Sequence, residues 1–125
     1  LIWIRLTARG AAAHGSRVHH DNAVTKLARA VAALGQTNWP IALTPATRRM
    51  VDDLAALAEI DASDADAVAA LTGPATGFVQ STLRTTTNPT GLTAGYKHNV
   101  IPDRAEALEH EQARPYVEPR SALSA

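Results

Sequence analysis

A histidine in a loop of small side chains is the first residue of this sequence that could do chemistry. His14 lies within the stretch GAAAHGS at positions 10–16, directly after a segment that alternates like a strand. Small neighbours leave the imidazole room to reach outward. It could donate a hydrogen bond to a developing oxyanion, or act as an acid or base. Taken alone, this loop is explained more simply by a surface histidine without a chemical role.

Two further histidines, His19 and His20, follow closely, so that three imidazoles fall within seven positions. Such a group could suggest a zinc site. However, adjacent side chains point apart in most backbones, and no carboxylate stands at a recognisable zinc spacing. The chain also has no cysteine, which excludes thiolate nucleophiles and cysteine-type zinc sites. We therefore expect solvated histidines and no metal ion held by this chain.

The second candidate is the stretch GYKHNVIPD at positions 95–103. Asn99, fixed in an extended segment by the Val-Ile-Pro that follows, could present its amide to a substrate carbonyl or carboxylate. Gly95 would let a ligand or another backbone come close. A glycine bulge followed by an Asn-mediated turn accounts for the pattern without a ligand. The sequence contains neither a Gly-x-Ser-x-Gly nucleophile motif nor a phosphate-binding glycine loop.

Strand and helix patterns indicate the elements that must position these loops. Residues 2–9 alternate between two faces, as a half-buried strand does. Asp21 or Asn22 can cap a helix over about 22–34, where apolar residues recur at helical spacing, and Gly35 can end it. Two more helices are expected over about 45–58 and 63–71. Extended segments are expected over 78–87, 92–96, 100–101 and 105–108, with a turn at 88–91.

This order of elements predicts an α/β fold of the α+β sandwich kind, with helices on one face of an antiparallel sheet. We assign residues 1–108 to one domain with a helical insertion at about 36–77, and residues 109–125 to an irregular tail. A zero formal net charge gives no reason to expect a nucleic-acid partner. No apolar run approaches the roughly 20 residues that span a bilayer. The lack of cysteine fits a cytoplasmic location.

The two motifs, in this order and spacing, resemble the lid or dimerisation domain of a family of zinc hydrolases. That family contains aminoacylases, glutamate carboxypeptidases and succinyl-diaminopimelate desuccinylases. The first signature is RGAAAHGS at 9–16, followed by NAV at 22–24 opening a helix. The second is TTNPT at 86–90, followed by NVIP at 99–102. Together the matches cover roughly residues 1–35 and 78–108.

The resemblance implies a ferredoxin-like βαββαβ lid domain, a homodimer, and a separate catalytic domain that holds two zinc ions. It implies hydrolysis of an amide, in a peptide or an N-acyl amino acid, by a zinc-activated water. By match, His14 stabilises the tetrahedral intermediate, commonly in the partner subunit's active site. Asn99 helps to position the substrate, and Gly95 lies near its carboxylate. The metal ligands and the catalytic base fall outside these residues.

The resemblance stops at about Leu108, because the family's Asp-x-Arg ending, closing helix and last strand have no counterpart in the tail. The sandwich is therefore expected to be incomplete at its C-terminus, and an exposed edge beside residues 100–108 would invite pairing with another chain. Two other interpretations stay open. The chain could be a stand-alone α/β dimerisation or ligand-binding module without catalysis, or a small enzyme that uses His14 by itself.

Overall fold

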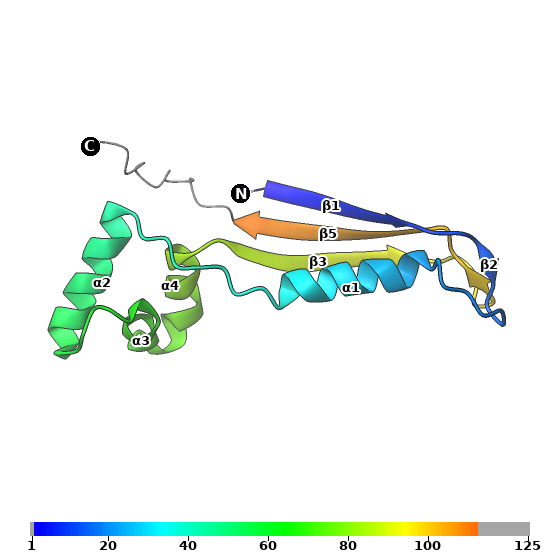
Figure 1. The fold of residues 1–125 in the computed structure, drawn as a ribbon. Coiled ribbons are helices and arrows are strands. Elements are labelled where there is room, and N and C mark those ends of the chain that lie inside the picture. The colour runs from blue at the N-terminus through cyan, green and yellow to red at the C-terminus, as the bar shows by residue number, and fades with distance from the viewer. Residues whose placement is uncertain (1, 113–125) are drawn as a thin grey trace, which may run out of the picture. The chain divides into compact units, whose positions relative to one another are not determined.

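The computed structural model describes residues 2–112, which divide into two compact units (Figure 1). Unit 1 combines Leu1–Pro40 with Thr86–Gln112, and the described part of unit 2 is Ile41–Thr85. Both candidate motifs belong to unit 1. Each unit has its own buried core and is described by itself.

Unit 1 is built on a three-stranded antiparallel sheet with the order β1-β5-β3. Strand β1 spans Ile2–Arg9, β3 spans Thr86–Ala94, and the central strand β5 spans Arg104–Gln112. The alternation expected over residues 2–9 is confirmed, since all eight residues of β1 pair with β5. A second, two-stranded ladder joins β2 (Ala13–His14) to β4 (Val100–Ile101).

Helix α1 (Ala23–Gly35) covers one face of this sheet (Figure 1). The core between them consists of Ala23 and Leu27 from the helix and Ala105 and Ala107 from β5, each at most 2% exposed. Alanine on both surfaces lets the helix backbone approach the strand closely. Burying a leucine side chain contributes about 1.5–3 kcal/mol, so Leu27 supplies the largest single apolar anchor. The helix expected over 22–34 is confirmed.

The start of α1 is fixed by two local features. The side chain of Asn22 caps the helix by accepting hydrogen bonds from the backbone N–H groups of Val24 and Thr25, at 2.9 and 3.3 Å. Gly10, at the end of β1, lies directly against this cap. A Cβ at Gly10 would stand 2.3 Å from the carbonyl oxygen of Asp21, a distance that real Cβ atoms do not reach. Only glycine lets β1 end this close to the helix.

Unit 2 is helical. It contains α2 (Pro45–Ala58), α3 (Ala65–Ala70), a 3-10 turn at Gly73–Ala75 and α4 (Thr76–Leu83). Thr44 and Thr47 form a capping box at the start of α2. The carboxylate of Asp66 accepts hydrogen bonds from Gln80 at 3.1 Å and from Arg84, tying α3 to α4. The core of unit 2 contains five fully buried residues: Val51, Ala55, Val68, Ala69 and Leu83.

The α+β sandwich with an antiparallel sheet is confirmed, but three local expectations are wrong. Of the segment 78–87 that was expected to be extended, residues 78–83 belong to helix α4 and only 86–87 lie in a strand, β3. Val79 and Leu83 pack into the core of unit 2, and this burial outweighs β propensity. The turn expected at 88–91 is a β-bulge between Pro89 and Gly91 inside β3. An edge strand tolerates proline, since its outer N–H groups need no partner in the sheet.

The third wrong expectation concerns the exposed edge beside residues 100–108. Strand β5 lies in the centre of the sheet and pairs on both sides, so the edges within the described residues belong to β1 and β3. Strand β5 continues to Gln112, four residues beyond the boundary drawn at Leu108. The remainder of the expected tail, 113–125, lies outside the described residues. Within 2–112, no helix has the length and apolar character required to cross a bilayer.

We predict that Gly10→Ala lowers the free energy of unfolding by about 1–3 kcal/mol, because the new methyl group forces the helix cap away from β1. Urea unfolding followed by circular dichroism measures this change. Gly35→Ala is the matched control in the same unit, since its Cβ would meet only Pro89, at 3.8 Å. It should leave stability unchanged or slightly raised. Equal stability of the two variants would contradict the proposed close approach.

Candidate functional site

The ladder of β2 and β4 brings the two candidate motifs together at one end of unit 1 (Figure 1). His14 pairs with Val100, and the backbone N–H of Gly15 donates to the carbonyl oxygen of Asn99 at 2.8 Å. The loop expected at positions 10–16 therefore contains a short strand. Local sequence could not show it, because its partner residues stand more than 80 positions later in the chain.

The ring of His14 is oriented by Ser16, two residues further along. The Oγ atom of Ser16 lies 2.8 Å from Nδ1 of His14, and the backbone N–H of Ser16 donates to the same nitrogen at 3.3 Å. A nitrogen that accepts from a backbone N–H carries no proton itself. The neutral ring then holds its proton on Nε2, which becomes the hydrogen-bond donor of an exposed imidazole. Ser16 was not among the expected site residues, although its position two residues after His14 is plain from the sequence.

Hydrogen bonds at the start of α1 hold the histidine loop. The backbone N–H of Ala11 donates to the carbonyl oxygen of Asp21 at 3.0 Å. The ammonium group of Lys26 donates to the carbonyl oxygen of Arg9 at 3.0 Å and forms an ion pair with the carboxylate of Asp21. The hydrogen bond and charge of Lys26 lower the pKa of Asp21. One lysine thus connects the end of β1 to the segment that precedes the helix.

On the other side of the ladder, a tight turn follows β3. Gly95 adopts a φ of +75°, a conformation that side chains rarely permit, so the chain can bend sharply there. The five residues Ala94–His98 line an open hollow of about 350 Å³. Asn99 follows at once and is exposed. Within the described residues its side-chain amide makes no hydrogen bond, so both the oxygen and the NH₂ group can meet a ligand.

The other histidines of the loop do not join His14 in a cluster. Nε2 of His19 lies 3.1 Å from the carbonyl oxygen of Asp21, and His20 is exposed. Between residues 2 and 112, no group of three or more His, Cys, Asp or Glu side chains could hold a metal ion. The described residues therefore do not fit a zinc ion.

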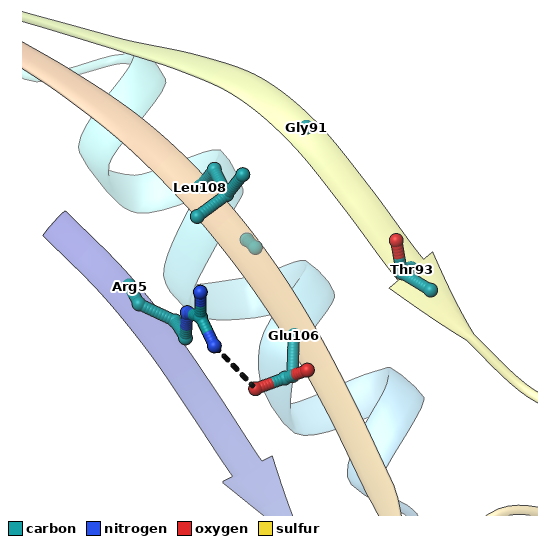
Figure 2. Close-up of a pocket in the computed structure, with 6 residues that line it drawn as sticks. Arg5, Gly91, Thr93, Glu106 and Leu108 are labelled. Atoms are coloured by element: carbon teal, nitrogen blue, oxygen red, sulfur yellow. Dashed lines mark ion pairs between the residues drawn. The ribbon is translucent and has the colours of Figure 1, made fainter. Parts of the chain in front are cut away.

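A separate pocket of about 160 Å³ lies on the sheet of unit 1 (Figure 2). Arg5 and Glu106 stand at its rim with their charged atoms 4.0 Å apart, and Arg104 donates to Glu106 at 2.7 Å. This hydrogen bond from Arg104 lowers the pKa of Glu106. The carboxylate is already neutralised by two cations, and none of the candidate site residues lines the pocket. We therefore centre the site on the β2/β4 ladder.

Unit 1 thus has the architecture of an accessory α+β domain that presents a histidine loop and an asparagine loop side by side. The family model described as the peptidase dimerisation domain matches residues 1–109. This chain belongs to the peptidase dimerisation domain family, which gives it a lid or dimerisation role in a protein of the peptidase class. No curated protein matches the chain.

We predict that Lys26→Met raises the pKa of Asp21 toward its ordinary value, as measured by an NMR titration of the carboxyl group. The folded-state pKa lies below the unfolded-state value, so the ion pair stabilises the fold above the unfolded-state pKa. That stabilisation is lost as the pH falls through the folded-state pKa. The variant should therefore lose less stability on acidification than the natural chain. Lys97→Met, at the chain's other lysine, is the control and should leave the titration of Asp21 unchanged.

Proposed function

We propose that this chain is the lid of a zinc-dependent amide hydrolase and that His14 stabilises the oxyanion formed during hydrolysis. The substrate class is a peptide or an N-acyl amino acid. The coarser role, a dimerisation domain of a peptidase-class protein, rests on the family match over residues 1–109. The chemical role rests on the arrangement of His14, Ser16 and Asn99.

The observation that carries the proposal is the pair of contacts from Ser16 to Nδ1 of His14. An oxyanion is stabilised best by a donor whose direction is set before the negative charge develops. Because Nδ1 accepts a hydrogen bond from the backbone N–H of Ser16, the proton of the neutral ring is on Nε2. The exposed ring can then donate a hydrogen bond from Nε2 to a substrate oxygen. A surface histidine without a role needs no such fixed tautomer. The small residues on either side of His14 leave space for a substrate.

Asn99 and Gly95 are proposed to position the substrate beside His14. The 2.8 Å hydrogen bond between Gly15 and the carbonyl oxygen of Asn99 fixes the backbone of the two loops relative to each other. The side-chain amide of Asn99 has no hydrogen bond within the described residues, and we propose that it binds a polar group of the substrate. Gly95 shapes the turn without adding a side chain that would exclude the ligand.

The zinc ions and the catalytic base are proposed to belong to a separate catalytic domain, since the described residues offer no metal-binding group. When bound there, zinc would activate the attacking water. The contribution of this chain is then to orient the substrate and to stabilise negative charge. We further propose that the complete protein is a cytoplasmic homodimer in which His14 reaches the partner subunit's active site.

We predict that His14→Ala in the complete enzyme lowers kcat by about 10²–10³-fold, as loss of one oxyanion donor does. Steady-state kinetics measures the loss, and size-exclusion chromatography should show that the dimer persists. His20→Ala is the control, because His20 is an exposed histidine of the same loop that makes no hydrogen bond within the described residues. A His14→Ala enzyme with near-normal kcat would contradict the proposed role.

Metal removal tests the rest of the proposal. Chelation of the complete protein should abolish amide hydrolysis, and added zinc should restore it. Elemental analysis of the isolated 125-residue chain should find no stoichiometric zinc. Amide hydrolysis that survives full chelation would disprove zinc dependence. A complete protein without any hydrolase activity would instead favour the stand-alone dimerisation or ligand-binding module.

A further inference from the structure

We propose that the pocket on the face of the sheet opposite α1 binds a short aliphatic carboxylate. Arg5 provides the guanidinium group that binds the carboxylate, and Leu108 beside Gly91 provides the apolar surface for the carbon chain (Figure 2). The pocket is separate from the β2/β4 ladder, since none of the candidate site residues lines it. This inference goes beyond the proposed function, and the binding does not depend on it.

The register of the sheet builds this pocket from three strands. Leu108 of the central strand β5 lies between its two cross-strand partners, Arg5 of β1 and Gly91 of β3. Glu106 and Thr93 are direct partners in the next row that lines the pocket. The residue between Leu108 and Glu106 is buried in the core with α1, so these two side chains face the other side of the sheet. The pocket therefore has an apolar centre with charged and hydroxyl groups at its edge.

The lack of a side chain at Gly91 leaves Leu108 open to a ligand. A Cβ at position 91 would lie 3.5 Å from Cβ of Leu108, in ordinary van der Waals contact, so a side chain there would cover the leucine. With glycine, Leu108 stays 43% exposed in a pocket of about 160 Å³. This volume lies below the roughly 300–1,000 Å³ of sites for drug-sized ligands, so it suits a ligand of a few carbon atoms.

Arg5 has hydrogen-bond donors that its neighbours do not use. Its guanidinium group lies 4.0 Å from Oε1 of Glu106, which is too far for a hydrogen bond, and its side chain is 66% exposed. The same oxygen of Glu106 already accepts from Arg104 at 2.7 Å and from Thr7 at 3.4 Å. Within residues 2–112 the side chain of Arg5 makes no hydrogen bond. A ligand carboxylate can therefore accept two parallel hydrogen bonds from its guanidinium group.

The charges at the pocket favour an anionic ligand. Arg5 and Arg104 carry two positive charges against one negative charge on Glu106. The hydrogen bond from Arg104 lowers the pKa of Glu106, so this carboxyl group is ionised at neutral pH. A monocarboxylate brings the total charge to zero, whereas a zwitterionic amino acid leaves one positive charge in excess. The hydroxyl group of Thr93 can donate a further hydrogen bond to the ligand.

The proposed function would itself supply a ligand of this class. Hydrolysis of an N-acyl amino acid adds water across the amide bond and releases the acyl group as a carboxylic acid, together with the free amino acid. A short acyl group leaves as a short aliphatic carboxylate, which matches the pocket in charge and in size. Binding can nevertheless be measured whether or not the protein hydrolyses amides.

The test titrates the 125-residue chain with 3-methylbutanoate and follows the backbone amide signals of Gly91 and Thr93 by NMR. We expect both signals to shift and to saturate. 3-Methylbutanamide, which has no charge, should cause no saturable shift, and L-valine, which adds an ammonium group, should bind more weakly. The ionic strength is held constant, because salt screens interactions between exposed charges.

Three variants separate the contributions to binding. Arg5→Met should raise the Kd for 3-methylbutanoate about tenfold or more, as for loss of a hydrogen bond to a charged group. Arg29→Met is the matched control, since it removes an equal charge from α1, which covers the other face of the sheet, and should leave Kd unchanged. Gly91→Ala should weaken binding without unfolding the chain, because its methyl group covers Leu108 at an ordinary contact distance.

Several results would overturn the carboxylate site: no saturable binding, equal binding of the carboxylate and its amide, or tighter binding of L-valine. An unchanged Kd in the Arg5→Met chain would overturn it as well, and circular dichroism verifies that this variant is folded. None of these results touches the proposed function, which depends on His14 and the β2/β4 ladder. Conversely, a complete protein without hydrolase activity would leave the binding site in place.

Discussion

The close approach of helix α1 to the end of β1 is the constraint on which the rest of unit 1 depends. Ala23 and Leu27 pack against Ala105 and Ala107 with almost no exposed surface, and Gly10 leaves no room for even a methyl group. Because the helix start is fixed against the sheet, the residues between β1 and α1 must form a compact loop. That loop carries His14, so packing in the core determines where the histidine lies.

The candidate site consists of two loops that are far apart in the sequence. The periodicity of apolar residues does not predict that they pair. The central strand β5 follows directly after β4, and the same chain segment therefore supplies both the middle of the sheet and the partner of the histidine loop. The position of the candidate site therefore depends on the position of β5 in the sheet. Displacing β5 would displace Val100 and Asn99 as well, and His14 would lose the backbone that holds it.

Much of the fold could be predicted from the sequence, and the errors arise where contacts between distant segments outweigh local preference. The alternation over residues 2–9 and the capped helix after Asn22 depend on neighbours in the sequence, so local patterns revealed them. The segment 78–87 is rich in β-branched residues, which favour strands, yet residues 78–83 lie in helix α4. Its side chains Val79 and Leu83 instead fill a helical core, a contact with residues far away in the sequence. Pro89 suggested a turn, but an edge strand accommodates it as a bulge.

The sequence by itself determined the chemical groups: a histidine among small residues, an asparagine before Val-Ile-Pro, and a glycine able to adopt a positive φ. It also sufficed to indicate the family, which the match over residues 1–109 confirms. Only the tertiary structure decided that His14 pairs with Val100 and that the backbone N–H of Gly15 donates to the carbonyl oxygen of Asn99. These contacts depend on the distances between atoms in the folded chain. They arise when strands 85 residues apart pair with each other, and no local pattern contains them.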